Sequence, residues 1–304
     1  MKKIIYPCIF IFLFLFMIIN PALTFNGASA GLLLWFQIVL PTLLPFFILT
    51  NMMIRSNSIQ YISNLCYPLF HRIFQVSKNG SFAILSGFLC GYPIGAKVTA
   101  DLFQTNRISL EEASYLLSFC NNTSPAFIVS YIVLQHLRTP NLLIPSICIL
   151  YLSPILCSFF FRRYYKIKNI ACTEPNHENS IHFSFEMIDD SIMNSFENIT
   201  KVGGYIILFS ILLYLGRQFS IAPVLAVLEI TNGIPLIFEI TPEFHIQYIS
   251  AMALTSFGGF CAIAQTNSMI SNTRLSIIPY IVEKLITTLV TSLLTLLYVM
   301  IILR

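Results

Sequence analysis

The stretch Ser86-Gly-Phe-Leu-Cys-Gly-Tyr-Pro-Ile-Gly-Ala-Lys97 decides the fold, because it interrupts a run of apolar sequence that begins at Phe82. Gly91, Pro93 and Gly95 lie so close together that a continuous helix cannot hold all three without breaking. The sequence therefore predicts a turn at this point.

A second interruption, Asn121-Asn-Thr-Ser-Pro125, lies in the apolar run from Ala113 to Gln135. That run is long enough to span a bilayer, which takes about 20 residues. Free backbone N–H and C=O groups cost several kcal/mol each in hydrocarbon, so irregular backbone there is covered by protein or lines a cavity. Gly and Pro are also ordinary kink residues of membrane helices, but two breaks so close together favour a binding site.

The composition indicates a polytopic membrane protein. Of 304 residues, 56% are hydrophobic and 10% are charged, and the mean hydropathy is +0.78. Soluble domains carry about a quarter charged residues. The net charge of +4 comes from basic residues in short loops, which act as topology signals, so no nucleic-acid partner is predicted.

Cysteine and histidine spacings predict neither a metal site nor a cofactor. The eight cysteines lie mostly in apolar runs without C-x-x-C spacing, and the five histidines form no H-E-x-x-H pair. The adjacent Glu111 and Glu112 could suggest an intramembrane protease, but Ser109-Leu-Glu-Glu112 fits a capping box better. With no nucleophile beside a base, we expect no enzyme activity.

The N-terminal segment allows two interpretations. It is a signal peptide cleaved near Ala28-Ser-Ala30, or an uncleaved first helix from Ile4 to Asn20, which we favour. Lys2 and Lys3 then place the N-terminus in the cytoplasm. The uncharged residues 21–30 are expected to form an outside loop, before a second helix.

The remaining segments divide into two halves. In the first, residues 81–97 are too short to cross and are expected to form a re-entrant hairpin, followed by a helix broken at 121–125 and a helix from Asn141 to Phe161. Residues 162–200 begin with a basic, cytoplasmic cluster and continue as an amphipathic helix over 183–199.

The second half repeats this order with the opposite starting direction. A helix from Ile199 to Leu215 precedes a hairpin broken at Glu229–Pro235, a helix broken at Ser256–Gly259, and a last helix from Ile277 to Leu303. The predicted fold is an all-α polytopic membrane protein, an inverted repeat with two re-entrant hairpins and two discontinuous helices. Its expected parts are residues 1–30, a repeat over 31–161, a linker over 162–200 and a repeat over 201–304.

The breaks supply the candidate substrate-binding residues. They are Gly91, Tyr92, Pro93, Gly95, Lys97, Asn121, Asn122, Ser124, Glu229, Thr231, Asn232, Ser256, Gly258 and Gln265. Glu229 is the candidate ion-coupling residue, since a carboxylate in an apolar run usually faces a cavity or a partner; a shallow position near the outer interface is the alternative. Lys97 is either a counter-ion or snorkels toward the cytoplasm. Such side chains suit a polar, neutral solute.

Four motifs carry a family resemblance. They are Gly87-x-x-x-Gly-Tyr-Pro-x-Gly-Ala-Lys97, Asn121-Asn-x-Ser-Pro-Ala-Phe127, Leu228-Glu-Ile-Thr-Asn-Gly233 and Ser256-Phe-Gly-Gly-x-x-x-x-x-Gln265. The chain resembles the YlbJ-type sporulation integral membrane proteins, which are similar to the wider nucleoside-recognition or Gate group. That resemblance implies a bacterial cell-membrane protein with a role in sporulation.

Two functions follow as hypotheses. The first is a secondary transporter or permease for a small polar solute, nucleoside-like or other, bound where the broken helices meet. The second is a non-transporting membrane scaffold for spore-envelope assembly, with a sporulation membrane partner bound through residues 162–200. Both place the chain in the lipid bilayer, and either is compatible with a homo-oligomer.

Overall fold

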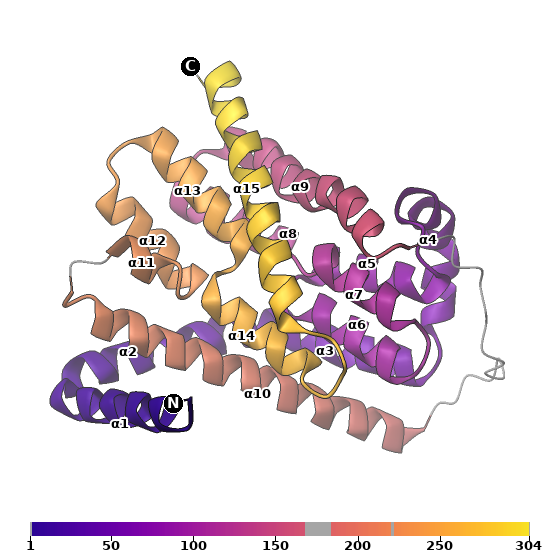
Figure 1. The fold of residues 1–304 in the computed structure, drawn as a ribbon, viewed down its shortest axis with the longest axis horizontal. Coiled ribbons are helices and arrows are strands. Elements are labelled where there is room, and N and C mark those ends of the chain that lie inside the picture. The colour runs from indigo at the N-terminus through magenta and orange to yellow at the C-terminus, as the bar shows by residue number, and fades with distance from the viewer. Residues whose placement is uncertain (1, 168–183, 220–221, 304) are drawn as a thin grey trace.

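A computed structural model describes residues 2–167, 184–219 and 222–303, and every regular element in these ranges is a helix. Six helical stretches in the described chain are long and apolar enough to cross a membrane. They are Pro21–Arg55, Leu110–Leu137, Pro140–Tyr164, Phe185–Gly216, Phe244–Ile270 and Ile277–Ile302. The protein is therefore a multi-pass integral membrane protein, as predicted, and Figure 1 shows its long helix α10 along one side of the bundle.

The N-terminal part is helical throughout. Helix α1 (Lys2–Ile19) is followed by α2 (Pro21–Leu34), a π-helical turn (Trp35–Val39) and α3 (Leu40–Arg55). The expected outside loop over residues 21–30 is therefore wrong. The absence of charge there reflects helix packing instead of a loop.

Helix α2 packs closely on α10 (Phe185–Gly216) through two glycines four residues apart. A Cβ atom on Gly27 would lie 2.8 Å from the Cα of Ile211, and one on Gly31 would lie 2.8 Å from the Cα of Ile207. Small residues at this spacing let membrane helices approach closely. Figure 1 shows the two helices side by side.

Helix α4 (Ile59–Phe74) was not predicted. Asn64, Pro68 and His71 interrupt its apolar run, so no spanning pattern is visible in the sequence. It packs on α5 (Lys78–Cys90).

The first two predicted breaks are confirmed. Helix α5 ends at Cys90, α6 (Ile94–Gln104) follows, and Gly91 between them has φ of +85°, which favours glycine. Helix α7 (Leu110–Cys120) stops before residues 121–124, and the chain resumes as α8 (Pro125–Phe127) and a π-helix (Ile128–Leu137). Ser124 is the N-cap of α8, with its Oγ accepting from the N–H of Phe127.

The predicted capping box is only half present. The Oγ of Ser109 accepts from the N–H of Glu112 at 3.2 Å. The Glu112 carboxylate does not reach back to Ser109; it is 1% exposed and accepts from the N–H of Ser77 at 2.6 Å. Glu112 thus satisfies a donor at the start of α5 and ties α7 to that helix.

The linker and the first helix of the second half are continuous. The amphipathic helix expected over 183–199 is present from Phe185 and packs on α2 and α3, but it continues without a break to Gly216 instead of forming an element of its own. The part of the linker over residues 168–183 lies outside the described residues. Before it, a short 3₁₀ turn (Pro140–Leu142) leads into α9 (Leu143–Tyr164).

The remaining breaks are present, with one shift in position. Helix α11 (Ala222–Ala226) is separated from α12 (Ile230–Ile240) by residues 227–229, so the break ends at Glu229 instead of extending to Pro235. Pro235 lies inside α12. Helices α13 (Phe244–Phe257) and α14 (Gly259–Ile270) meet at Gly258, with φ of +82°, and α15 (Ile277–Ile302) is the last helix.

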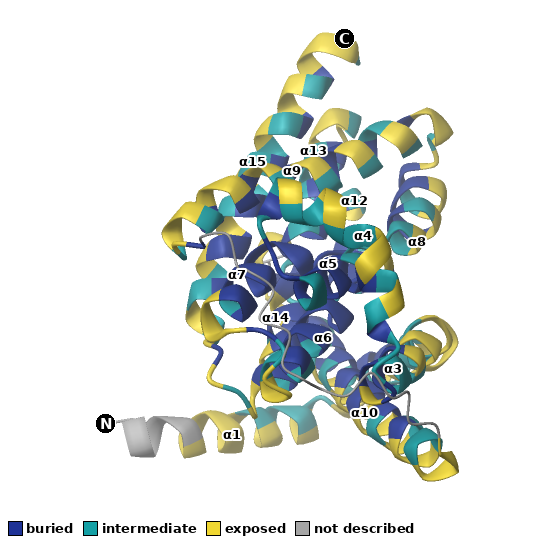
Figure 2. Cartoon of the chain, turned by 90° about the vertical axis from the view of Figure 1, so that its right-hand side faces the viewer, coloured by how far each residue is buried: buried dark blue, intermediate teal, exposed yellow. Residues whose placement is uncertain are grey.

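The core lies where the broken helices meet. Figure 2 shows buried residues concentrated on α5, α6, α7 and α14, whereas exposed residues mark the outer helices. Large apolar side chains such as Leu65, Ile144 and Leu289 are exposed on the outside, as expected of helices that face lipid.

Candidate functional site

The breaks of the first half contact each other directly. Residues 91–93 and 121–124 form what we call the first crossing, where the N–H of Tyr92 donates to the carbonyl of Asn122 at 2.6 Å. A Cβ atom on Gly91 would lie 2.7 Å from the Ser124 nitrogen, so this close approach requires glycine. The two irregular segments therefore satisfy part of each other's backbone.

The breaks of the second half contact each other in a similar way. Residues 227–229 and 257–261 form the second crossing. The N–H groups of Phe260 and Cys261 donate to the carbonyls of Val227 and Leu228, both at 2.9 Å. The start of α14 is thus capped by the turn that follows α11.

Two further contacts join the crossings to each other. The hydroxyl of Thr123, in the first crossing, donates at 2.8 Å to the carbonyl of Thr255, in the last turn of α13 just before the second crossing. A Cβ atom on Gly258 would lie 3.5 Å from the ring of Tyr92. All four breaks therefore meet in one place, although they are far apart in sequence.

Asn121 and Asn122 hold the first crossing through distant partners. The side chain of Asn121 accepts from the N–H of Ala96 at 3.2 Å and donates to Thr266 and Tyr280, both at 2.9 Å. The Oδ1 of Asn122 accepts from the Nζ of Lys284 at 3.1 Å. Both asparagines are buried, and helices α6, α14 and α15 position them.

Glu229, the last residue of the 227–229 segment, accepts hydrogen bonds from local partners. Its carboxylate accepts from the N–H groups of Thr231 (3.0 Å) and Asn232 (2.9 Å). It also accepts from the Thr231 hydroxyl (2.5 Å) and the Asn232 side-chain amide (2.9 Å). Glu229 is therefore the N-cap of α12, and it is 3% exposed.

The crossings border a cavity of about 300 Å³, which we call the central cavity. Six of the candidate binding residues line it: Tyr92, Ser124, Glu229, Thr231, Gly258 and Gln265. Residues of α2, the π-helix at 35–39, α3 and α10 close its other side. The volume is at the lower end of the range for small-molecule sites.

Other candidate residues do not line the cavity; they make contacts between the helices around it. Asn232 donates to Ser210 on α10 at 3.1 Å, and Ser256 accepts from Thr291 on α15 at 2.9 Å. Pro93 is the N-cap of α6. Gly91, Asn121 and Asn122 lie at the first crossing, and Gly95 packs against Asn121 from α6; none of these four lines the cavity.

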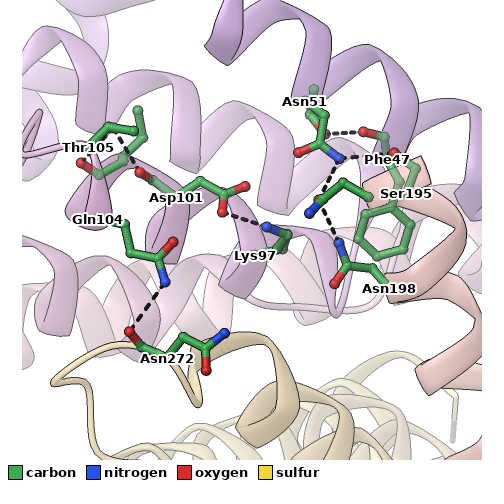
Figure 3. A network of polar contacts seen from close by, with 12 residues as sticks. Phe47, Asn51, Lys97, Asp101, Gln104, Thr105, Ser195, Asn198 and Asn272 are labelled. Carbon is green, nitrogen blue, oxygen red and sulfur yellow. Dashed lines mark hydrogen bonds and ion pairs between the residues drawn. The ribbon is translucent and has the colours of Figure 1, made fainter. Parts of the chain in front are cut away.

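Lys97 pairs with its neighbour on the next turn of α6. Its Nζ lies 2.5 Å from the Oδ1 of Asp101, and the two side chains are 13% and 14% exposed. Burial raises the pKa of Asp101, while the charge of Lys97 lowers it. Figure 3 shows this pair and the nearby contact in which Asn51 of α3 donates to Ser195 of α10 at 2.9 Å.

Sequence reasoning left several residues out of the site. Cys90, Thr123, Tyr131 and Cys261 line the cavity without having been predicted. Lys284, which is 3% exposed, holds Asn122. The sequence feature that indicates a role for Lys284 is a charged side chain within an apolar, membrane-spanning run.

Glu283, next to Lys284, points to a different partner. Its carboxylate accepts from the hydroxyl of Tyr165 at 2.5 Å. Adjacent helix residues point about 100° apart, which explains why Glu283 and Lys284 have separate partners.

Comparison with known proteins supports the predicted resemblance. Residues 36–135 match the model of the Gate family, described as nucleoside recognition. The chain is 27% identical over 317 residues to the sporulation integral membrane protein YlbJ of Bacillus subtilis (strain 168), covering 91% of this chain and 78% of that protein. No solved structure gives a significant match. The predicted resemblance is thereby confirmed: residues 36–135 match the Gate family model, and the chain is similar to YlbJ along most of its length.

Proposed function

We propose that this protein is a secondary transporter or permease for a small polar solute, with the central cavity as its binding site. The observation that carries the proposal is that all four helix breaks meet at one cavity and contribute polar groups to it. Discontinuous helices that meet within the bilayer are typical of secondary transporters.

The proposal includes an inverted repeat. Each half contains a helical hairpin, a broken helix and a closing helix, and in each half the two breaks bond to each other through backbone groups. On this basis α5–α6 and α11–α12 are re-entrant hairpins that enter from opposite sides, with the N-terminus in the cytoplasm. Rocking of one repeat against the other would expose the cavity alternately.

The similarity to YlbJ supports a role in the cell membrane during sporulation. The description of the Gate family supports nucleoside-like solutes as the first compounds to test. A scaffold for spore-envelope assembly, with or without homo-oligomers, is the alternative if no solute is found.

Uptake into vesicles containing the purified protein tests the proposal. Gln265→Leu removes a polar group from the cavity wall at similar size, and we expect uptake to fall about tenfold or more. Gln104→Leu, at an exposed position outside the cavity, is the matched control and should leave uptake unchanged. Equal uptake by both variants at equal membrane abundance would reject the central cavity as the transport site.

A further inference from the structure

A second hollow, which we call the surface groove, lies between the end of α3 and the first half of α10. It has a volume of about 670 Å³ and opens to the surface. Its walls carry two ion pairs, Arg55 with Asp190 at 2.8 Å and Lys201 with Glu197 at 2.6 Å, beside Asn194. None of these residues lines the central cavity, so the groove is a separate space.

Helix α3 leads from the central cavity to the surface groove. Leu43 lines the cavity, and Arg55 lines the groove. Phe47 and Asn51 lie between them at intervals of four residues. Four residues of a helix rise about 6 Å and return to nearly the same face. The four side chains therefore form one line from the cavity to the groove.

Helix α10 makes the same connection in the opposite direction. Val202 lines the cavity and Asn194 lines the groove, with Asn198 between them at the same spacing. The Nδ2 of Asn51 donates to the Oγ of Ser195 at 2.9 Å and to the Oδ1 of Asn194 at 3.2 Å. These bonds fix α10 beside α3, so that the two lines of side chains face each other.

Helix α6 packs on α3 next to this contact. It begins at the first crossing, directly after Tyr92 and Pro93, and carries the Lys97–Asp101 pair in its first two turns. Burial raises the pKa of Asp101, while Lys97 and then Arg55, in the groove wall, lower it. We call the region where these helices meet the seam; it comprises residues 43–55 of α3, 94–101 of α6 and 190–206 of α10.

The polar groups of the seam are only partly bonded to each other. The Oδ1 atoms of Asn51 and Asn198 and the Nδ2 of Asn194 have no hydrogen-bond partner among the described residues. Lys97 uses one of its three donors, on Asp101. Buried polar groups that the protein leaves unbonded are normally satisfied by water or by a bound molecule. A seam that only held helices together would not need this spare capacity.

An apolar section separates these polar groups from the central cavity. Phe47 of α3 and Ile199 of α10 are both 0% exposed. Along their helices they lie between the cavity-lining Leu43 and Val202 and the amides of the seam. Figure 3 shows Phe47 at the contact between α3 and α10. Apolar constrictions of this kind close pathways through membrane proteins, because they exclude water and polar solutes.

We propose that the solute moves between the central cavity and the surface groove along the seam, and that Phe47 is the side chain that closes this route. The inference rests on the proposed function and deepens it, because it names the route and its gate. Asn51, Asn194 and Asn198 then offer their spare hydrogen-bonding groups to a polar solute that has left the water of the groove.

Thiol labelling of the cavity tests the route. In a chain without native cysteines, Ser124→Cys reports from the cavity wall, and Thr200→Cys, in a separate chain, identifies the side of the membrane on which the groove opens. A membrane-impermeant thiol reagent is applied on that side. We expect Phe47→Ala to raise the rate of labelling at position 124 about tenfold or more, because the loss of the ring opens the seam.

Phe161→Ala is the matched control for Phe47→Ala. Phe161 is 2% exposed and lies on α9, outside the seam, so its loss also removes a buried ring from the core. We expect it to leave the labelling rate at position 124 unchanged. Equal rates in the two variants, or an increase in Phe47→Ala only from the opposite side of the membrane, overturn the inference.

A second experiment leaves Phe47 in place. Ser195→Cys lies in the seam and Ser63→Cys lies on α4, and the two serines are 0% and 1% exposed. Thiol reactions depend on access, so we expect the same reagent to modify Ser195→Cys about tenfold or more faster than Ser63→Cys. The modification at 195 should also block uptake. Equally slow reactions at both positions would show that the seam only joins helices, which contradicts the inference.

The two proposals fail separately. If Phe47→Ala speeds labelling of the cavity but the protein takes up no solute, the permease is contradicted and the seam remains a route for water and small reagents. If solute is taken up while Phe47→Ala and Phe161→Ala label equally, the permease stands and the route through the seam is contradicted.

Discussion

In both crossings two helix breaks bond to each other through backbone groups, but the side chains that hold them have different partners. The first is held by Asn121 and Asn122, whose partners lie on helices α6, α14 and α15. The second is held by backbone bonds between residues 227–228 and 260–261, and beside it Glu229 caps α12 with four donors that all belong to Thr231 and Asn232. The first crossing thus depends on the whole bundle, whereas the second is largely built locally.

This difference suggests a division of roles. Removing a side chain at the first crossing disrupts several helices together, so its main effect should be on stability. Removing Glu229 changes one helix cap and the charge of the cavity, so its main effect should be on function. The predictions below test this division from the largest expected effect to the smallest.

The largest effect on stability is expected at Gly87 and Gly233, because each lies against a backbone carbonyl in its half of the chain. A Cβ atom would lie 1.9 Å from the Cys120 carbonyl oxygen in Gly87→Ala and 2.0 Å from the Ala226 carbonyl oxygen in Gly233→Ala. Because backbone must move, each change should cost about 3 kcal/mol or more of the free energy of unfolding. Unfolding in mixed micelles with increasing dodecyl sulfate measures this.

Gly204→Ala is the control for these two changes, since nothing lies within 4 Å of its added Cβ atom. It should be as stable as the original protein or slightly more so, since alanine favours a helix. If Gly87→Ala were as stable as Gly204→Ala, the close approach of α5 to α7 would be incorrect.

Asn121→Ala should cost about 1–3 kcal/mol of stability, because the buried N–H of Ala96 and two hydroxyls lose their partner. Asn64→Ala, at an exposed position on α4, should change stability by less than about 0.5 kcal/mol. The same unfolding assay compares them, and equal stabilities would show that the first crossing does not depend on this residue.

In contrast to Asn121→Ala, Glu229→Gln should affect uptake much more than stability. The loss of a helix cap costs about 1 kcal/mol, less than expected for the first crossing, while uptake should be abolished. Membrane abundance and initial uptake rate, measured on the same vesicles, separate the two effects. Normal uptake by Glu229→Gln would remove this residue from the functional site.

Lys284→Met should have the smallest effect on stability, within about 1 kcal/mol, since it removes a buried charge whose partner is a neutral amide. Lys201→Met, which breaks an exposed pair with Glu197, should change stability by less than about 0.5 kcal/mol and serves as control. A loss of several kcal/mol in Lys284→Met would mean that the charge itself holds Asn122 in place.

The positions of the breaks followed from sequence because glycine, proline and capping residues act locally. Gly91, Ser124 and Gly258 were predicted on this basis and are found where expected. The outside loop at 21–30 failed because the decisive contact of Gly27 and Gly31 is with α10, distant in the chain. Periodicity within one segment does not show which helix it will pack against.

The same distinction applies to the candidate site: residues with a local sequence signal were predicted, whereas contacts that depend on distant helices were not. Glu229 and Thr231 were predicted and line the cavity, because a carboxylate in an apolar run is itself a signal. Lys284 is a charged residue within an apolar run, but its role in holding Asn122 depends on how α15 packs beside α7. The break at 227–229 was misplaced because Pro235 is accommodated inside α12.

The central claim is that four helix breaks enclose a single cavity, and thiol labelling tests it most directly. A water-soluble thiol reagent is applied to proteins that carry Ser124→Cys or Thr231→Cys, with the other native cysteines removed and position 261 occupied by either the small Cys261→Ala or the bulky Cys261→Phe. Because all three positions line the same space of about 300 Å³, we predict that the bulky side chain at 261 strongly slows labelling at 124 and 231 relative to the small one. Labelling at an unchanged rate at both positions would show that the breaks do not share one cavity.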